Sequence, residues 1–305
     1  MIIKNNQAIA GIVFIDKERG VYSNSVVEKI KKVIKGVKVG HLGTLDPLCT
    51  GILPICIGKA TRLSSLLMKS DKSYSATFLL GITTDTYDIE GKTVDKKDAS
   101  HITMKKIREV VKGFQGEIQQ IPPFFSAKKF KGQPLYKYAR AGEFITLQPV
   151  VVKVYGIEIL DYSNDELRLI IRCSAGTYVR SLAHDIGKNL GCGACCKEMR
   201  RIQWSTFSEM HTIKLQDFCD SEDKLQYVVP LNSLLLSSFS TIELDDSLAA
   251  LFKRGHDIPI QRVKAEMIDL CQDSQTELFR ASDTNGNLLG ILSKSGNYLH
   301  PLIVL

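Results

Sequence analysis

The sequence contains no long apolar run. None of its segments approaches the roughly 18 consecutive apolar residues that a membrane-spanning helix needs. The first residues also lack the layout of a signal peptide, because their apolar part is short and is interrupted by Lys4, Asn5 and Asn6. We therefore expect a cytoplasmic protein with no membrane partner, whose eight cysteines are reduced thiols.

Motifs that would indicate a bound nucleotide or metal ion are incomplete. Gly51 and Gly58 are separated by six residues instead of the four of a phosphate-binding P-loop, and Ala60 stands where Ser or Thr is required. The cysteines within 192–196 have no second Cys or His pair at a zinc-finger distance. The acidic loop 85–91 lacks the twelve-residue calcium pattern. We expect no cofactor and no metal.

A moderate excess of basic residues is present instead. Lys and Arg number 40 against 33 acidic residues, and the net charge of +7 permits a nucleic-acid partner without proving one. The 305 residues are enough for two domains. We predict a larger domain at residues 1–237 and a small β domain at 238–305, because the segment from Thr241 onward is β-rich and contains an Asn285-Gly286 hairpin turn.

Hydrophobic periodicity predicts both strands and helices. Strands are expected at 10–16, 52–57, 72–81, 150–161 and 166–173, and the period of two places Tyr74 on the same face as Phe78. Helices are expected at 103–114, after Arg180, and from a capping box formed by Ser25 and Glu28. The outer face of that last helix carries Lys29, Lys31, Lys32 and Lys35, which we interpret as solvated or as phosphate contacts.

The most informative stretch is the glycine-rich loop 40–51. It contains three glycines, His41 and Asp46, and Pro47 biases Asp46 away from the helical region toward an extended conformation. Such a turn can display a reactive side chain, although Asp is also an ordinary turn former in surface loops. The apolar run 52–57 that follows anchors the loop to a core.

This loop carries a resemblance to a known family. Residues 40–63, GHLGTLDPLCTGILPICIGKATRL, resemble the signature of the TruB-type tRNA pseudouridine-55 synthases, and residues 176–180, GTYVR, resemble the family's Gly-Thr-Tyr-x-Arg motif. The resemblance covers residues 11–205. It implies an α+β pseudouridine synthase fold: a mixed, mainly antiparallel sheet flanked by helices, an RNA-clamping insertion at about 119–149, and a C-terminal PUA-like β domain.

The resemblance also implies an activity and a set of site residues. The activity is isomerisation of uridine to pseudouridine at position 55 in the T-loop of tRNA, which needs no cofactor because the reaction is redox-neutral. Asp46 would be the nucleophile that attacks the sugar or the base of a flipped-out nucleotide, and Arg180 would keep it charged through a bidentate pair. Tyr178 would pack against the base and accept a proton.

Three further residues would bind the substrate. His41 would fill the gap that the flipped base leaves, Tyr74 would stack on the uracil, and Met199 would form an apolar wall where the family usually has Leu. Read without the motif, His41 would be a loop histidine bonded to its own turn, and Tyr74 a core tyrosine with a satisfied hydroxyl. The other departures from the family, Leu42, Cys49 and Glu18, remove no group that the chemistry needs.

The insertion mixes aromatic rings with cations, as suits a segment that follows phosphates and stacks on bases. It could equally be a partly ordered insertion with a short helix, and only the resemblance favours RNA contact. The residues expected to bind RNA are Lys128, Lys129, Lys131 and Arg140, together with Lys17 in the first turn, where the family usually has Lys-Pro. The expected partner is the T stem-loop of tRNA, bound by a monomer.

Two rival functions compete with this interpretation. The same scaffold could serve as an RNA-folding chaperone that needs no chemistry. Alternatively, His184-Asp185 could belong to a metal-dependent hydrolase, although companion ligands are missing from the sequence. The Asp46→Asn variant separates catalysis from chaperoning, and sensitivity to chelators tests the hydrolase.

Overall fold

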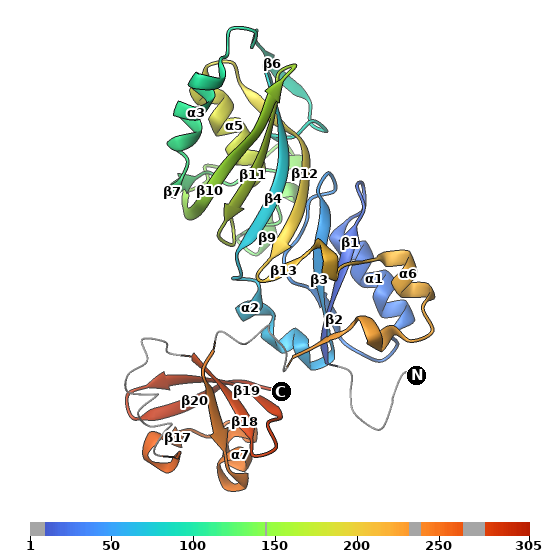
Figure 1. The fold of residues 1–305 in the computed structure, drawn as a ribbon, viewed down its shortest axis with the longest axis vertical. Helices are drawn as coiled ribbons and strands as arrows, with labels where there is room; N and C mark the ends of the chain where they lie inside the picture. Colours follow the sequence, from blue (N-terminus) through green and yellow to red (C-terminus); the bar gives the residue numbers. More distant parts are fainter. Residues whose placement is uncertain (1–9, 144, 232–238, 265–277) are drawn as a thin grey trace.

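The computed structural model describes residues 10–143, 145–231, 239–264 and 278–305. The strands of these residues form one large sheet, a separate five-stranded sheet near the C-terminus and two small hairpins (Figure 1). The domain boundary predicted after residue 237 lies outside the described residues, so the division at that residue stays a prediction. Among the described residues, no helix is both long enough and apolar enough to cross a bilayer.

The large sheet is mixed and mainly antiparallel, which confirms the predicted α+β class. Its strands are β1 (Gly11–Lys17), β2 (Val39–His41), β3 (Thr50–Ile57), β4 (Lys72–Leu80), β7 (Gly116–Gln120), β10 (Val150–Ser163), β11 (Glu166–Cys173), β12 (Ala194–Trp204), β13 (Phe207–Ser208), β14 (Ile213–Lys214) and β15 (Val229–Pro230). The main strand order is β14-β1-β3-β12-β4-β11-β10-β7. Only the β1–β14 and β3–β12 pairs among these strands are parallel. The two hairpins are β5 (Ile82–Thr84) with β6 (Thr93–Lys96), and β8 (Lys129–Phe130) with β9 (Gln133–Pro134).

Helices pack against the large sheet and connect its strands. They are α1 (Ser23–Val33), α2 (Ser64–Leu67), α3 (Met104–Lys112), α4 (Leu135–Arg140), α5 (Val179–Leu190) and α6 (Leu215–Asp220), with single 3-10 turns at η1 (Gly58–Leu63), η2 (Glu209–His211) and η3 (Lys224–Tyr227). The predicted capping box of α1 is wrong, because the helix begins at Ser23 and Tyr22 is its N-cap residue. The Ser23 side chain is instead bonded to the loop that carries Asp46.

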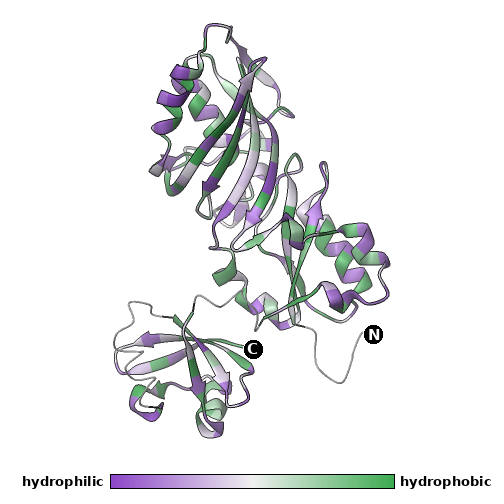
Figure 2. Cartoon of the chain, in the orientation of Figure 1, coloured by the Kyte–Doolittle hydropathy of each residue, from purple (hydrophilic) through white to green (hydrophobic). Residues whose placement is uncertain are grey.

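The core lies on both faces of the sheet around β1. Val13 and Ile15 belong to a cluster that packs α1, α3, α5 and α6 onto the sheet, whereas Ile12 and Phe14 belong to a second cluster on the opposite face. The alternation predicted for β4 is confirmed, since Tyr74 and Phe78 are buried in the first cluster. Hydrophilic and hydrophobic residues alternate along α3, as expected for a helix with one buried face (Figure 2).

The two halves of the large sheet meet at one narrow junction. β3 and β12 are paired only through Arg200 with Thr50 and Arg201 with Gly51. Gly51 has a φ of +92°, and a Cβ atom at this position would lie 2.3 Å from the Arg201 carbonyl oxygen. The strands can therefore approach here only because residue 51 lacks a side chain. The connection that carries Asp46, between β2 and β3, lies directly before this junction.

The C-terminal sheet has the strand order β16-β18-β19-β20-β17. Its elements are β16 (Thr241–Leu244), α7 (Asp246–Lys253), β17 (Ile258–Pro259), η5 (Ile260–Arg262), β18 (Leu278–Asp283), β19 (Leu288–Ser295) and β20 (Tyr298–Val304). Asn285-Gly286 forms the predicted turn between β18 and β19. This sheet contacts the rest of the chain where Arg62 Nη1 donates a hydrogen bond of 2.7 Å to the Val304 carbonyl.

Replacement of Gly51 by alanine should destabilise the protein more than the same change at Gly36. Both residues have positive φ, but a Cβ at Gly36 meets no atom within 4 Å. Gly36→Ala should therefore cost only the left-handed strain of about 1–2 kcal/mol, and Gly51→Ala at least about twice that. Urea titration of both variants measures the difference, and equal costs would contradict the proposed close approach at the junction.

Candidate active site

The loop that carries Asp46 is fastened to the first turn of the chain by a buried cation. Lys17 is fully buried, and its Nζ donates hydrogen bonds to the carbonyls of Val21 at 2.8 Å, Glu18 at 3.0 Å and Pro47 at 3.3 Å. Burial lowers the pKa of this ammonium. The predicted RNA contact of Lys17 must therefore be corrected, because the side chain has no exposed surface to offer a phosphate.

Two more side chains hold the loop from other directions. Ser23 Oγ lies 2.9 Å from both the backbone nitrogen and the carbonyl oxygen of Leu45. Arg201 is buried in β12, where its Nε donates to the Ile52 carbonyl at 2.7 Å and its Nη2 to the Gly43 carbonyl at 3.2 Å. The backbone around Asp46 is thus bonded on both sides, while the Asp46 side chain itself keeps 31% exposure.

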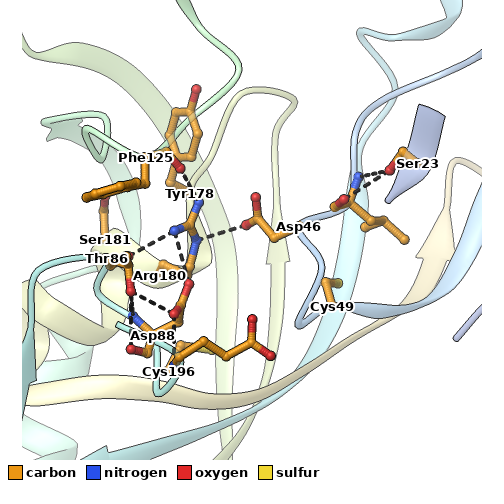
Figure 3. Close-up of polar contacts among 12 residues, drawn as sticks. Ser23, Asp46, Cys49, Thr86, Asp88, Phe125, Tyr178, Arg180, Ser181 and Cys196 are labelled. Atoms are coloured by element: carbon orange, nitrogen blue, oxygen red, sulfur yellow. Dashed lines mark hydrogen bonds and ion pairs between the residues drawn. The ribbon is translucent and has the colours of Figure 1, made fainter. Parts of the chain in front are cut away.

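Asp46 meets Arg180, which lies in the first turn of α5. The Asp46 Oδ2 and Arg180 Nε atoms are 2.8 Å apart, and Figure 3 shows the guanidinium between Asp46 and Asp88. Arg180 Nη1 donates to Asp88 Oδ2 at 3.1 Å and to the Thr86 carbonyl at 2.9 Å. Its Nη2 donates to the Phe125 carbonyl at 2.9 Å. The expected bidentate pair is not formed, because each carboxylate contacts a different nitrogen.

The guanidinium of Arg180 is almost fully enclosed, with 4% of its side chain exposed. Burial by itself disfavours the charged form, but the carboxylates of Asp46 and Asp88 outweigh it and raise the pKa of Arg180. The arginine is therefore a permanent cation, and its two Nη atoms donate hydrogen bonds to Asp88 and to two carbonyls. Among the described residues, its contact with Asp46 involves one carboxylate oxygen, Oδ2.

Sequence reasoning missed Asp88. This residue is 6% exposed, and its Oδ1 accepts hydrogen bonds from Thr86 Oγ1 at 2.7 Å and from the Glu90 N–H at 3.1 Å. From the sequence, its loop is an incomplete calcium site that also resembles a second loop of the family, and neither interpretation singles out Asp88. Nothing in the local pattern distinguishes Asp88 from Asp85, so the partnership with Arg180, 92 residues away, becomes visible only in three dimensions.

A cavity of about 330 Å³ opens beside Asp46. The predicted residues Tyr74, Tyr178 and Met199 line it together with Arg180. Burial raises the pKa of both tyrosine hydroxyls, so each is protonated at neutral pH. The backbone N–H of Tyr178 donates to Gln120 Oε1 at 2.7 Å, which fixes the start of α5 against β7. The volume lies at the lower end of the range for small-ligand sites.

Sequence reasoning also missed two basic residues of this cavity, Arg201 and Lys72. Lys72 is 6% exposed, and its Nζ donates to the Met68 carbonyl at 2.8 Å and to the Ser70 carbonyl. Burial, followed by the nearby positive charge of Arg201, lowers the pKa of Lys72 to about 8. The cavity is therefore lined by a lysine ammonium that loses its proton in mildly alkaline solution.

A second hollow, of about 620 Å³, adjoins the first at Asp46 and Arg180. His41 lies in it, and burial and then Arg201 lower the pKa of its imidazole, which is therefore neutral at pH 7. The insertion supplies Tyr136 and Arg140 to the opposite wall. Lys128, Lys129 and Lys131 are exposed around the β8–β9 hairpin. Residues 119–120, at the approximate start of the expected insertion, belong to β7.

The described residues contain no group of three or more His, Cys, Asp and Glu side chains placed to hold a metal ion. His184 is stacked on Tyr87, with 4.0 Å between the ring centroids. Cys192, Cys195 and Cys196 are buried, free thiols. Neither motif supplies a ligand set to the part of the chain that the structure describes.

The titration of Lys72 gives a direct test of this geometry. Because burial favours the neutral amine, the side chain should lose its charge as the pH rises through about 8, well below the usual 10.5. In a protein labelled with ¹³C at lysine Cε, one resonance should titrate near that pH and disappear in Lys72→Met. A Lys72 resonance that keeps its charge to pH 10 would contradict the burial. The exposed Lys128 is a matched control, and Lys128→Met should leave the titrating resonance in place.

Comparison with known proteins places this geometry in a family. Residues 31–179 match the model of the TruB family pseudouridylate synthase N-terminal domain, and residues 180–236 match the tRNA pseudouridylate synthase B C-terminal domain. The chain is 41% identical over 255 residues to a tRNA pseudouridine synthase B of Francisella philomiragia, which covers 83% of this chain and 84% of the relative. A Francisella tularensis protein of the same name is 38% identical with the same coverage.

Among solved structures, the chain is similar to a protein in the structure of an H/ACA RNP bound to a substrate RNA containing 2′-deoxyuridine. The TM-score is 0.71 at 25% sequence identity, over 96% of this chain and 84% of that one. This likeness extends the fold match through the C-terminal sheet. Taken together with the two domain matches and the identity to curated relatives, it shows that the chain belongs to the TruB family of pseudouridylate synthases, enzymes of the isomerase class.

Proposed function

We propose that this protein converts uridine to pseudouridine at position 55, in the T-loop of tRNA, with Asp46 as the nucleophile. The observation that carries the proposal is the 2.8 Å contact between Asp46 and Arg180 at the place where two hollows meet. The names of the curated relatives support tRNA as the substrate. The cytoplasmic location and the monomeric state expected from the sequence remain part of the proposal.

The reaction needs a nucleophile held still beside a base-sized space. Overall, the bond between uracil N1 and the sugar C1′ breaks, a bond between C5 and C1′ forms, and the proton of C5 is replaced by one on N1. Attack by the free Asp46 oxygen, at the sugar or at the base ring, would divide this change into easier steps. The cavity beside Asp46 would retain the detached base while it rotates.

Surrounding side chains would divide the remaining tasks. Tyr74 and Met199 line the cavity and would contact the two faces of the uracil. Tyr178 is protonated at neutral pH, so its hydroxyl could donate to a base oxygen and relay the proton that C5 releases. His41, being neutral and partly enclosed, could occupy the gap left by the flipped nucleotide, whose unstacking costs a few kcal/mol.

The insertion would hold the RNA stem-loop against this site. Lys128, Lys129 and Lys131 are exposed on its hairpin, and Arg140 lies over the ring of Tyr136 at 5.6 Å from the centroid. Exposed cations next to aromatic rings are suited to phosphates and unpaired bases. These four residues are among the RNA contacts that the sequence predicts. Lys17, the fifth, does not belong to the proposed RNA surface, because its buried ammonium holds the loop that carries Asp46.

Replacement of the nucleophile tests the proposal. Asp46→Asn keeps the size of the side chain but removes its charge, and the rate of pseudouridine formation should fall at least about 10⁴-fold. The release of tritium from a T stem-loop transcript with [5-³H]uridine measures the reaction. Asp85→Asn, in a neighbouring loop, is the matched control and should keep its activity. Normal turnover by Asp46→Asn would rule out this nucleophile.

The directed donors of Arg180 make a second prediction. Arg180→Lys keeps a positive charge. The single nitrogen of an ammonium, however, cannot contact Asp46, Asp88 and two carbonyls at once, as the three nitrogens of the planar guanidinium do. Single-turnover rates should fall about 10²- to 10³-fold while RNA affinity changes little. Arg168→Lys provides the control, because the side chain of Arg168 pairs with the exposed Asp161. Retention of the rate by Arg180→Lys would show that charge alone suffices.

A further inference from the structure

Tyr22 occupies a position where a tyrosine side chain contributes little to the stability of the fold. It is the N-cap residue of α1, a place that favours short side chains able to accept a backbone hydrogen bond, and its side chain makes no capping bond. The residue is 58% exposed. Within the described residues, its hydroxyl has no hydrogen-bond partner and its ring no aromatic or cationic neighbour. The start of the helix is closed by backbone hydrogen bonds instead, since the Tyr22 carbonyl accepts one from the Ser25 N–H at 2.9 Å.

The position of Tyr22 relative to Asp46 is nevertheless closely fixed. The residue before it, Val21, shares the Lys17 ammonium with Pro47, and the residue after it, Ser23, is bonded to Leu45. Pro47 and Leu45 are the two neighbours of Asp46. Two short segments therefore run side by side and are bonded on both sides, with Tyr22 at the centre of one and the nucleophile at the centre of the other.

Tyr22 also lines the hollow of about 620 Å³ that contains Asp46, His41 and Arg180. Tyr136 and Arg140 of the insertion form another part of its wall, so aromatic rings enter the hollow from two separate elements. The carboxylates of Asp46 and Asp88 in this hollow share the charge of Arg180. The rings of Tyr22 and Tyr136 offer faces for stacking, and Arg140 offers a cation for a phosphate, which together suit an unpaired nucleotide.

We propose that Tyr22 is a stacking platform for an unpaired base of the RNA next to the uridine that Asp46 attacks. This inference rests on the proposed function and adds a positioning residue to it. The phenol ring supplies the contact, so its hydroxyl is dispensable. Because the two segments are fastened together, a base stacked on Tyr22 would be held at a constant distance from the nucleophile.

Affinity for a T stem-loop RNA should depend on the ring of Tyr22. Tyr22→Ser should weaken binding about 10- to 100-fold, as the loss of one base-aromatic stack does, while the single-turnover rate at saturating RNA stays within about threefold. Tyr22→Phe should bind like the unchanged protein. Serine is itself a favoured N-cap residue, so the loss cannot be attributed to an unfolded helix. Tyr298→Ser, an exposed tyrosine of the C-terminal sheet, should have no effect.

Fluorescence supplies a readout that a purely structural role would not change. The sequence has one tryptophan, Trp204, which is fully buried and gives a constant background. In Tyr22→Trp the new indole should be quenched when the RNA is added, whereas Tyr298→Trp should not respond. Unchanged affinity of Tyr22→Ser, or no quenching in Tyr22→Trp, would overturn the inference. Failure of the unchanged protein to release tritium would instead overturn the proposed function, and the two results are independent.

Discussion

A single buried guanidinium determines how this site is built. Arg180 could not be enclosed by the fold unless its charge and its donors were matched, because an unpaired buried charge is very costly. The structure matches them with two carboxylates and two main-chain carbonyls from three separate segments. The loop of Asp46, the acidic loop of Asp88 and the insertion at Phe125 must therefore converge on the first turn of α5.

The other buried cations follow the same rule but bind the backbone. Lys17 and Arg201 donate to carbonyls on either side of Asp46, and within the described residues neither is paired with a carboxylate. This division is chemically useful. If Lys17 and Arg201 were also paired with the Asp46 carboxylate, both of its oxygens would be held. Because they bind the backbone instead, they fix the position of the loop and leave one carboxylate oxygen available. Lys17 and Arg201 thus fix the backbone of the loop, while Arg180 alone of these three cations contacts the Asp46 carboxylate.

The sequence predicted those parts of the molecule that depend on local pattern. The alternation of β4, the turn at Asn285-Gly286 and the exposed turn at Asp46 follow from the order of neighbouring residues, and the two family motifs identified Asp46 and Arg180 as a pair. Prediction from the sequence failed where contact with a distant residue determines the role or the conformation of a side chain. Asp88 acquires its role from Arg180, and α1 begins at Ser23, ahead of the predicted cap at Ser25, with the Ser23 side chain bonded to the distant Leu45. Lys17 looked like a surface cation, since nothing nearby shows that β3 and its loop cover it.

The cysteines of the described residues have a practical consequence. Cys49, Cys56, Cys173, Cys192, Cys195 and Cys196 are buried, and burial raises the pKa of each thiol, to about 12 for Cys49 and Cys56. Only the thiolate reacts quickly with electrophiles. An alkylating reagent will therefore spare these sulfurs until the fold opens. Cys49 is three residues from Asp46, so its rate of alkylation measures how often the loop that carries Asp46 opens.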